Sequence, residues 1–161
     1  MKLITKNVAE TKKLGQKIAK EFIRNLKPSN QAIVLNLDGD LGGGKTTFVQ
    51  GLANGLGIKK QILSPTFVLF KRYKLDDLPF NDFYHFDCYR LETKADINNL
   101  KEMHLKDIIR NPKNIVAIEW SERLKNLRPN GASFHFVFRS EKEREIKTEG
   151  IPCDINIKES E

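Results

Sequence analysis

The first hydrophobic pattern along the chain has the period of a helix. Apolar side chains return every three or four residues over residues 7–26, at Leu14, Ile18, Phe22 and Leu26. This spacing predicts an amphipathic helix with one buried face. Asn7 followed by Glu10 forms a capping pair at its start, and the segment from Lys27 to Asn30 supplies the break.

Two apolar runs with almost no polar interruption predict strands. They cover residues 32–37 (AIVLNL) and 115–118 (IVAI). Continuous apolar runs of this length are typical of strands that are buried on both faces of a parallel sheet. After the first run comes a glycine-rich loop and then a helical pattern from Lys45 to about Leu56, which Gly55 and Gly57 end.

The remaining segments predict shorter elements. Residues 67–73 and 83–87, separated by a turn at 76–79, predict an antiparallel hairpin. Weak helical periodicity covers residues 91–110. From Ser133 onward aromatic and polar residues alternate, and we expect an antiparallel extension of the sheet there, with further short strands at 144–147 and 151–157.

Length and composition favour a single globular domain spanning residues 1–161. The chain has 161 residues, 39% hydrophobic and 30% charged, and no apolar run approaches the ~20 residues of a membrane span. The first residues also lack the pattern of a secretory signal. We therefore expect a cytoplasmic protein with no membrane association.

The net charge of +7 favours acidic partners such as nucleotides, RNA or an acidic protein surface. Much of this charge falls on one side of the first predicted helix, at Lys13, Lys17, Lys20, Arg24 and Lys27. A solvated helix face is the plainer interpretation of that stripe. A binding surface for RNA is the alternative.

The glycine-rich loop carries the clearest chemistry. Its sequence, GDLGGGKT at residues 39–46, fits G-x-x-x-x-G-K-[ST] without a mismatch and lies between a buried strand and a helix. Glycines let backbone N–H groups approach phosphates, and the helix directs its positive end at the same anion. The motif predicts that Lys45 bridges the β and γ phosphates of a nucleoside triphosphate and that the Thr46 hydroxyl ligates Mg²⁺.

A second acidic group is expected at the carboxyl end of a neighbouring strand, and two candidates exist. Glu119 follows the continuous apolar run, so we favour it as the magnesium-side carboxylate, direct or through water. Asp87 is then left for water positioning or for a switch contact. The structural alternatives are a strand-end cap for Glu119 and a salt bridge with Arg90 for Asp87.

Six further residues have weaker indications. Ser64 and Thr66 lie after the loop helix, where NTPases often place a segment that senses the γ-phosphate, although a plain turn is an equal interpretation. The three histidines share no ligand spacing, so we interpret them as structural or surface residues. Trp120 is interpreted as a core anchor in preference to a stacking platform.

Several motifs together resemble the TsaE family, formerly called YjeE. Their order and spacing match over residues 39–120, and the first helix and residues 143–146 extend the similarity. The motifs are GDLGGGKTT at 39–47, SPTF at 64–67, HFDCYR at 85–90 and IEW at 118–120. The resemblance implies an α/β, P-loop NTPase-like three-layer sandwich with a central, mostly parallel sheet and antiparallel additions.

The resemblance also implies a function. Members of the family are small P-loop ATPases, weak alone, that assist the TsaB–TsaD complex in forming threonylcarbamoyladenosine in tRNA without transferring the group themselves. We accordingly expect contact with tRNA only through that complex, and a monomer when alone. The cofactors would be ATP and Mg²⁺, with Mg²⁺ held by Thr46 and Glu119.

The site residues implied by the resemblance fall into three groups. The catalytic group is Lys45, Asp87 and Glu119, and the switch group is Ser64 and Thr66. The nucleotide-binding group is Gly39, Asp40, Leu41, Gly42, Gly43, Gly44, Lys45, Thr46, Thr47, Val8 and Arg144, with Val8 near the adenine. Two departures are Gly43, where the family usually has Ala, and Cys88, where it usually has Leu; neither removes a chemical group.

Two other functions remain open from the residues alone. A small-molecule kinase with a P-loop is the first, although between Lys45 and Trp120 the arginines are only Arg72, Arg90 and Arg110, without the cluster of a kinase lid. A nucleotide-dependent RNA-binding module using the basic first helix is the second, and it predicts steep salt dependence.

Overall fold

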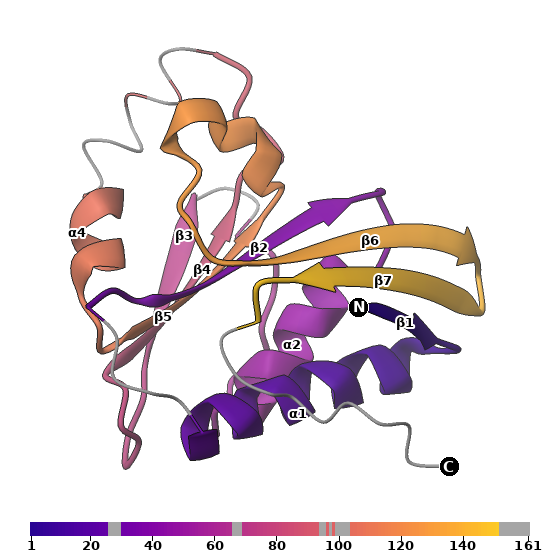
Figure 1. The fold of residues 1–161 in the computed structure, drawn as a ribbon, viewed down its shortest axis with the longest axis horizontal. Coiled ribbons are helices and arrows are strands. Elements are labelled where there is room, and N and C mark those ends of the chain that lie inside the picture. The colour runs from indigo at the N-terminus through magenta and orange to yellow at the C-terminus, as the bar shows by residue number, and fades with distance from the viewer. Residues whose placement is uncertain (26–29, 66–68, 94–95, 97, 99–103, 152–161) are drawn as a thin grey trace.

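A central sheet organises the molecule (Figure 1). The computed structural model describes residues 1–25, 30–65, 69–93, 96, 98 and 104–151. Within these residues the sheet has seven strands in the order β1-β7-β6-β2-β5-β4-β3. Their bounds are β1 Lys2–Thr5, β2 Ile33–Gly39, β3 Phe70–Lys74, β4 Asp82–Asp87, β5 Asn114–Glu119, β6 Ala132–Ser140 and β7 Glu143–Glu149.

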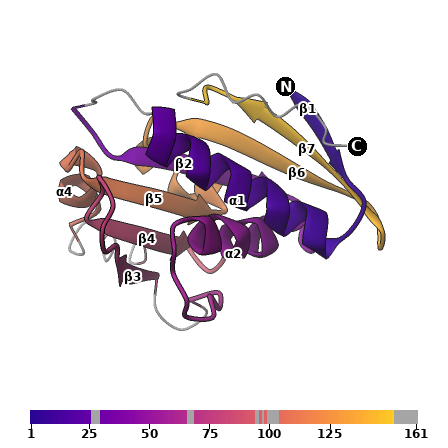
Figure 2. The same cartoon turned by 90° about the horizontal axis from the view of Figure 1, so that it is seen from below.

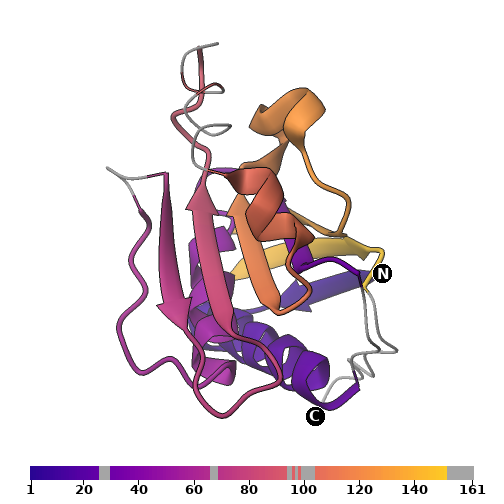
Figure 3. The same cartoon turned by 90° about the vertical axis from the view of Figure 1, so that its left-hand side faces the viewer.

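Helices cover both faces of the sheet. On one face α1 (Val8–Asn25) and α2 (Lys45–Gly55) lie side by side (Figure 2). On the other, α4 (Leu105–Arg110) and the 3-10 segment η1 (Ser121–Leu127) cover a smaller apolar core, as seen from the side of α4 in Figure 3. The predicted α/β three-layer fold is confirmed.

The two faces are visible in the alternation along β2. Ile33, Leu35 and Leu37 belong to the core beneath α1 and α2, whereas Val34 belongs to the core beneath α4 and η1. Successive side chains of a strand point to opposite faces. The run is apolar at nearly every position because one face of β2 packs under α1 and α2 and the other packs under α4 and η1.

Strand directions agree with the prediction in part. The strands β6, β2, β5 and β4 are mutually parallel, and β3 pairs antiparallel with β4 as the expected hairpin. In the segment from Ser133 onward, where an antiparallel extension was expected, β6 runs parallel to β2 and β7 pairs antiparallel with β6, whereas β1, which was not predicted, pairs antiparallel with β7. Alternation along β6 reveals one buried face but carries no information about direction.

The start of α1 follows the predicted capping pattern. The Asn7 side chain accepts a hydrogen bond from the Glu10 N–H at 2.8 Å, and Glu10 accepts one from the Lys6 N–H at 2.7 Å. These reciprocal bonds satisfy donors that a helix start leaves unpaired. Lys13, Lys20 and Arg24 are exposed on the outer side of the helix, as expected.

Several predictions differ from the structure or fall outside it. The strand β1 was missed because four residues carry too little pattern. Residues 91–93 are not helical, so the helix predicted from residue 91 is wrong at its start, and within the described residues its last part is α4. Thr66 and the segment 152–157 lie outside the described residues. No helix among the described segments is long and apolar enough to cross a membrane.

Candidate functional site

The glycine loop connects β2 to α2 and packs tightly against β6. Gly39 has φ of 107°, a left-handed conformation that favours glycine, and a Cβ there would lie 2.1 Å from the Phe136 carbonyl oxygen. The Asp40 N–H donates to the same oxygen at 2.9 Å, and the Asp40 carboxylate accepts from the Phe138 N–H at 2.9 Å. Strand β6 thus fixes the first half of the loop.

Lys45 lies folded against the loop. Its Nζ donates to the carbonyl oxygens of Gly39 at 2.7 Å and Asp40 at 2.8 Å, and lies 3.7 Å from the ring centroid of Trp120. Burial lowers the pKa of Lys45, and the charge of Glu119 opposes this shift. Trp120 therefore contacts the lysine through a cation–π interaction, a role that its interpretation as a core anchor missed.

Thr46 and Glu119 meet as the sequence predicted. The Thr46 hydroxyl donates to Glu119 Oε2 at 2.8 Å, and the Glu119 side chain is almost fully buried. The contact forms because β2 and β5 are parallel neighbours, with Leu37 opposite Glu119 in the register. Two oxygen groups therefore lie together at the start of α2, next to the lysine.

Asp87 lies directly beside Glu119 in the register of β4 and β5. Its carboxylate accepts hydrogen bonds from the Ser64 hydroxyl and from the Tyr89 N–H at 3.0 Å. The continuous apolar run favours Glu119, but β4 is also buried and parallel to β5 although its sequence lacks such a run. Both carboxylates therefore end adjacent parallel strands.

Arg144 reaches the glycine loop from β7. A Cβ built at Gly44 would lie 3.5 Å from both Arg144 Cδ and Thr11 Cγ2, so these side chains border the loop. Val8 is exposed at the start of α1, one turn before Thr11. Thr11 exchanges a 2.8 Å hydrogen bond with Thr5, the register partner of Arg144. Thr5 was missed because β1 was not predicted, and Thr11 was missed because its position in the predicted helix does not reveal its contact with Thr5.

His85 is the most informative residue that sequence reasoning missed. Its side chain is fully buried, and its Nε2 lies 2.8 Å from Glu119 Oε1. The interpretation as structural or surface rested on the absence of a metal-ligand spacing. Period-two alternation offered another indication, because His85 shares a face of β4 with Asp87 two residues later.

A second carboxylate cluster ties η1 to the end of β2. Asp38 accepts hydrogen bonds from the Ser121 hydroxyl at 2.6 Å, the Glu122 N–H at 3.1 Å and the Arg128 guanidinium at 2.6 Å. Burial opposes ionisation of Asp38, but these donors outweigh it and lower its pKa. Partial burial, a hydrogen bond to Asp38 and the charge on Asp38 raise the pKa of Glu122 to about 7.

Glu122→Gln is expected to flatten the pH dependence of stability. A carboxyl whose pKa rises from 4.5 to about 7 on folding stabilises the protein below pH 4.5 and loses that contribution as pH rises through 7. At pH 8 the variant should be more stable than the wild type by at most about 1 kcal/mol, because the exposed side chain is screened by water. At pH 5, close to the unfolded pKa of 4.5, the difference should be much smaller.

Thermal unfolding between pH 5 and pH 8.5 measures this effect. Glu149→Gln is the matched control, since it removes one exposed carboxylate from β7. Parallel profiles for Glu122→Gln and the wild type would contradict the assignment of this titration to Glu122.

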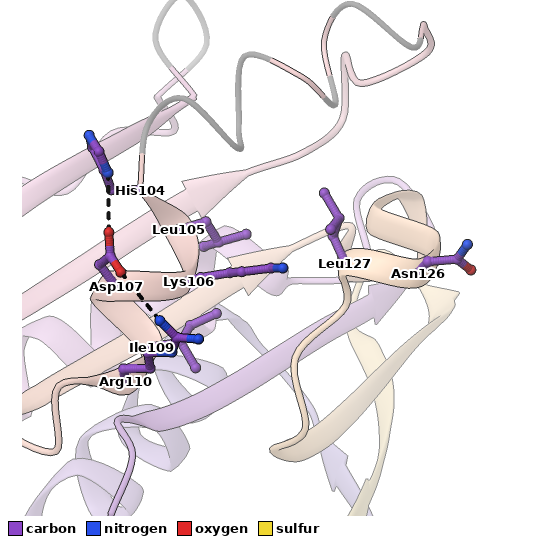
Figure 4. A pocket seen from close by; sticks show the side chains of 8 residues that line it. All are labelled: His104, Leu105, Lys106, Asp107, Ile109, Arg110, Asn126 and Leu127. Atoms are coloured by element: carbon purple, nitrogen blue, oxygen red, sulfur yellow. Dashed lines mark hydrogen bonds and ion pairs between the residues drawn. The ribbon is translucent and has the colours of Figure 1, made fainter.

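A cavity of about 380 Å³ lies elsewhere, between α4 and η1 (Figure 4). It is on the sheet face opposite α1 and α2, where Asp107 bridges His104 and Arg110. None of the residues predicted for the phosphate site lines it. Its lining residues are His104, Leu105, Lys106, Asp107, Ile109, Arg110, Asn126 and Leu127.

Comparison with known proteins agrees with the resemblance seen in the motifs. A family model described as "Threonylcarbamoyl adenosine biosynthesis protein TsaE" matches residues 5–147. The tRNA threonylcarbamoyladenosine biosynthesis protein TsaE of Nostoc sp. is 39% identical over 123 residues, covering 76% of this chain and 74% of the relative. The TsaE protein of Bacillus subtilis is 37% identical over 129 residues, covering 80% and 72%.

A solved structure shares the fold as well. The crystal structure of Bacillus subtilis YdiB matches with a TM-score of 0.69 and 29% sequence identity, covering 94% of this chain and 85% of that chain. On the family model, the sequence relatives and this structure together, the chain belongs to the TsaE family of tRNA threonylcarbamoyladenosine biosynthesis proteins.

Proposed function

We propose that this protein binds ATP with Mg²⁺ on the glycine loop and hydrolyses it, and that hydrolysis acts on the TsaB–TsaD complex during threonylcarbamoyladenosine formation. The observation that carries the proposal is the meeting of Lys45, Thr46 and Glu119 at one point. Thr46 Oγ1 and Glu119 Oε2 are 2.8 Å apart, at the first turn of α2 and beside the lysine. A cation, an oxygen pair and a helix N-terminus there suit a phosphate with its counter-ion.

The donor chemistry fits both groups. A hydroxyl and a carboxylate are the oxygen ligands that Mg²⁺ prefers, and Mg²⁺ commonly takes one or two such protein ligands together with phosphate oxygens. Gly44, with φ of 103°, precedes α2 and leaves its N–H unshielded by a side chain. Glycine at this point permits close approach of a phosphate to the backbone.

Each residue then has a defined task. Lys45 leaves the two loop carbonyls and donates to phosphate oxygens, exchanging neutral acceptors for charged ones. Glu119 and Thr46 would hold the magnesium ion through their oxygens. Bound magnesium would neutralise charge that develops on the phosphate oxygens. We assign the orientation of the attacking water to Asp87, whose carboxylate accepts hydrogen bonds from Ser64 and from the Tyr89 N–H.

The contact between Ser64 and Asp87 could transmit the nucleotide state to the TsaB–TsaD complex. Ser64 lies in the irregular segment after α2, and its hydroxyl bonds the carboxylate that we assign to water positioning. Loss of the γ-phosphate would change the surroundings of that carboxylate and with them the position of this segment. Such loops commonly report nucleotide state to partner proteins.

Reconstituted tRNA modification tests the proposal. Purified TsaB–TsaD, tRNA, ATP and the precursor of the transferred group are combined with the wild-type chain or with Asp87→Asn. We expect repeated turnover with the wild type, and at least a tenfold lower rate with Asp87→Asn although its affinity for ATP changes less than threefold, because a water-positioning group contributes to the transition state more than to binding.

Asp76→Asn is the matched control, since Asp76 is an exposed carboxylate in the turn between β3 and β4. Full multi-turnover modification without this chain would overturn the proposed role. Phosphate release that requires an added metabolite acceptor would instead indicate a small-molecule kinase.

A further inference from the structure

We propose that His85 is a positioning residue that holds the Glu119 carboxylate in the orientation needed to meet Thr46 and the metal ion. The role toward the metal ion rests on the proposed function. The contact between His85 and Glu119 is present in the structure without any ligand. The hydrogen bond of His85 is to Glu119. It acts through Glu119.

The Glu119 carboxylate is held at both oxygens. Nε2 of His85 lies 2.8 Å from Oε1, and the Thr46 hydroxyl lies 2.8 Å from Oε2. With one oxygen fixed from the sheet side, rotation of the carboxylate about its terminal bond is restricted. Oε2 therefore stays directed at the start of α2 when the hydroxyl turns to another partner.

The register explains why a histidine fits there. His85 lies opposite Ala117 in β5, and Glu119 is the next residue of β5 on the same face. The small side chain of Ala117 leaves space for the imidazole ring, which extends diagonally along the sheet to the carboxylate. Diagonal neighbours on one face are within reach of long and aromatic side chains.

The hydrogen-bond inventory assigns the tautomer. Among the described residues His85 Nδ1 is buried and has no hydrogen-bond partner. A buried N–H without an acceptor is rarer in proteins than a buried acceptor without a donor. The geometry therefore places a proton on Nε2, which donates it to Glu119 Oε1.

The tautomer can be measured in the wild-type protein without nucleotide or metal. Long-range ¹H–¹⁵N spectra of histidine-labelled protein near pH 7 distinguish the two neutral forms, and the signals lost in His85→Gln assign the residue. We expect a single Nε2–H tautomer. An Nδ1–H tautomer, or a mixture of the two forms, would overturn the inference.

The second test measures how much Mg²⁺ improves ADP binding, by calorimetry with Mg²⁺ or with EDTA. His85→Leu should reduce the improvement about tenfold, as expected for loss of an outer-shell partner, and leave the affinity in EDTA unchanged. His85→Gln, which retains an N–H donor, should recover most of the improvement. His135→Leu, at an exposed position of β6, is the matched control.

The outcomes separate this inference from the proposed function. If Mg²⁺ does not improve ADP binding to the wild type, the proposed magnesium site fails. If the wild type shows the improvement and His85→Leu keeps all of it, the positioning role fails alone. If His85→Leu loses the same factor of ADP affinity with Mg²⁺ and with EDTA, the histidine has a general structural role. That result would also overturn the positioning role.

Discussion

Lys45→Ala is expected to raise the dissociation constant for ATP by at least about 100-fold. The ammonium makes two hydrogen bonds to loop carbonyls, and we expect it to exchange them for bonds to charged phosphate oxygens. A hydrogen bond to a charged group contributes about 1.5–3 kcal/mol, and about 2.8 kcal/mol corresponds to a factor of 100 in affinity. Isothermal calorimetry with ATP and Mg²⁺ measures the change directly.

Lys13→Ala is the matched control for this substitution. Lys13 is exposed on the outer side of α1, so its removal changes the net charge equally without touching the loop. We expect wild-type affinity for this variant. An unchanged affinity in Lys45→Ala, with an unfolding temperature close to that of the wild type, would remove the glycine loop as the nucleotide site.

Gly51→Ala is expected to lower the free energy of unfolding by about 2 kcal/mol. Gly51 lies where α2 meets α1, and a Cβ there would be 2.0 Å from the Lys12 carbonyl oxygen. Overpacking against backbone costs about 3 kcal/mol, because the two helices must separate. Alanine recovers about 1 kcal/mol through its better helix propensity, so the loss is smaller than the overlap alone implies.

Urea denaturation of the variant and the wild type measures the difference. Asn54→Ala is the control in the same helix, because Asn54 is exposed and its substitution should be neutral or slightly stabilising. Wild-type stability in Gly51→Ala would show that α1 and α2 adjust to the methyl group without loss of packing.

The parts of the site that the sequence predicts are those whose geometry is local. The loop, Lys45 and Thr46 are adjacent in the chain, and the strand and helix on either side determine their relative positions. Glu119 could be added because a continuous apolar run identified its strand as central. The core beneath α1 and α2 was similarly predictable from helical spacing, with Phe22 and Leu52 both buried in it.

The parts that sequence reasoning missed depend on strand pairing. His85 contacts Glu119 because β4 and β5 are parallel in one register, and a shift of one residue would send the ring to the other face. Trp120 lies over Lys45 after a backbone turn with φ of 59°, which no periodic pattern indicates. The direction of β6 likewise follows from its place beside β2.

Strands made at very different times during protein synthesis form one wall of the site. Thr5 of β1 pairs with Arg144 of β7, so β1 can pair with β7 only after about 140 further residues have been synthesised. At roughly 5–20 residues per second the wait is on the order of ten seconds or more. The glycine loop therefore leaves the ribosome long before Arg144 does, and a nascent chain would hold an incomplete form of the proposed nucleotide site until β7 emerges.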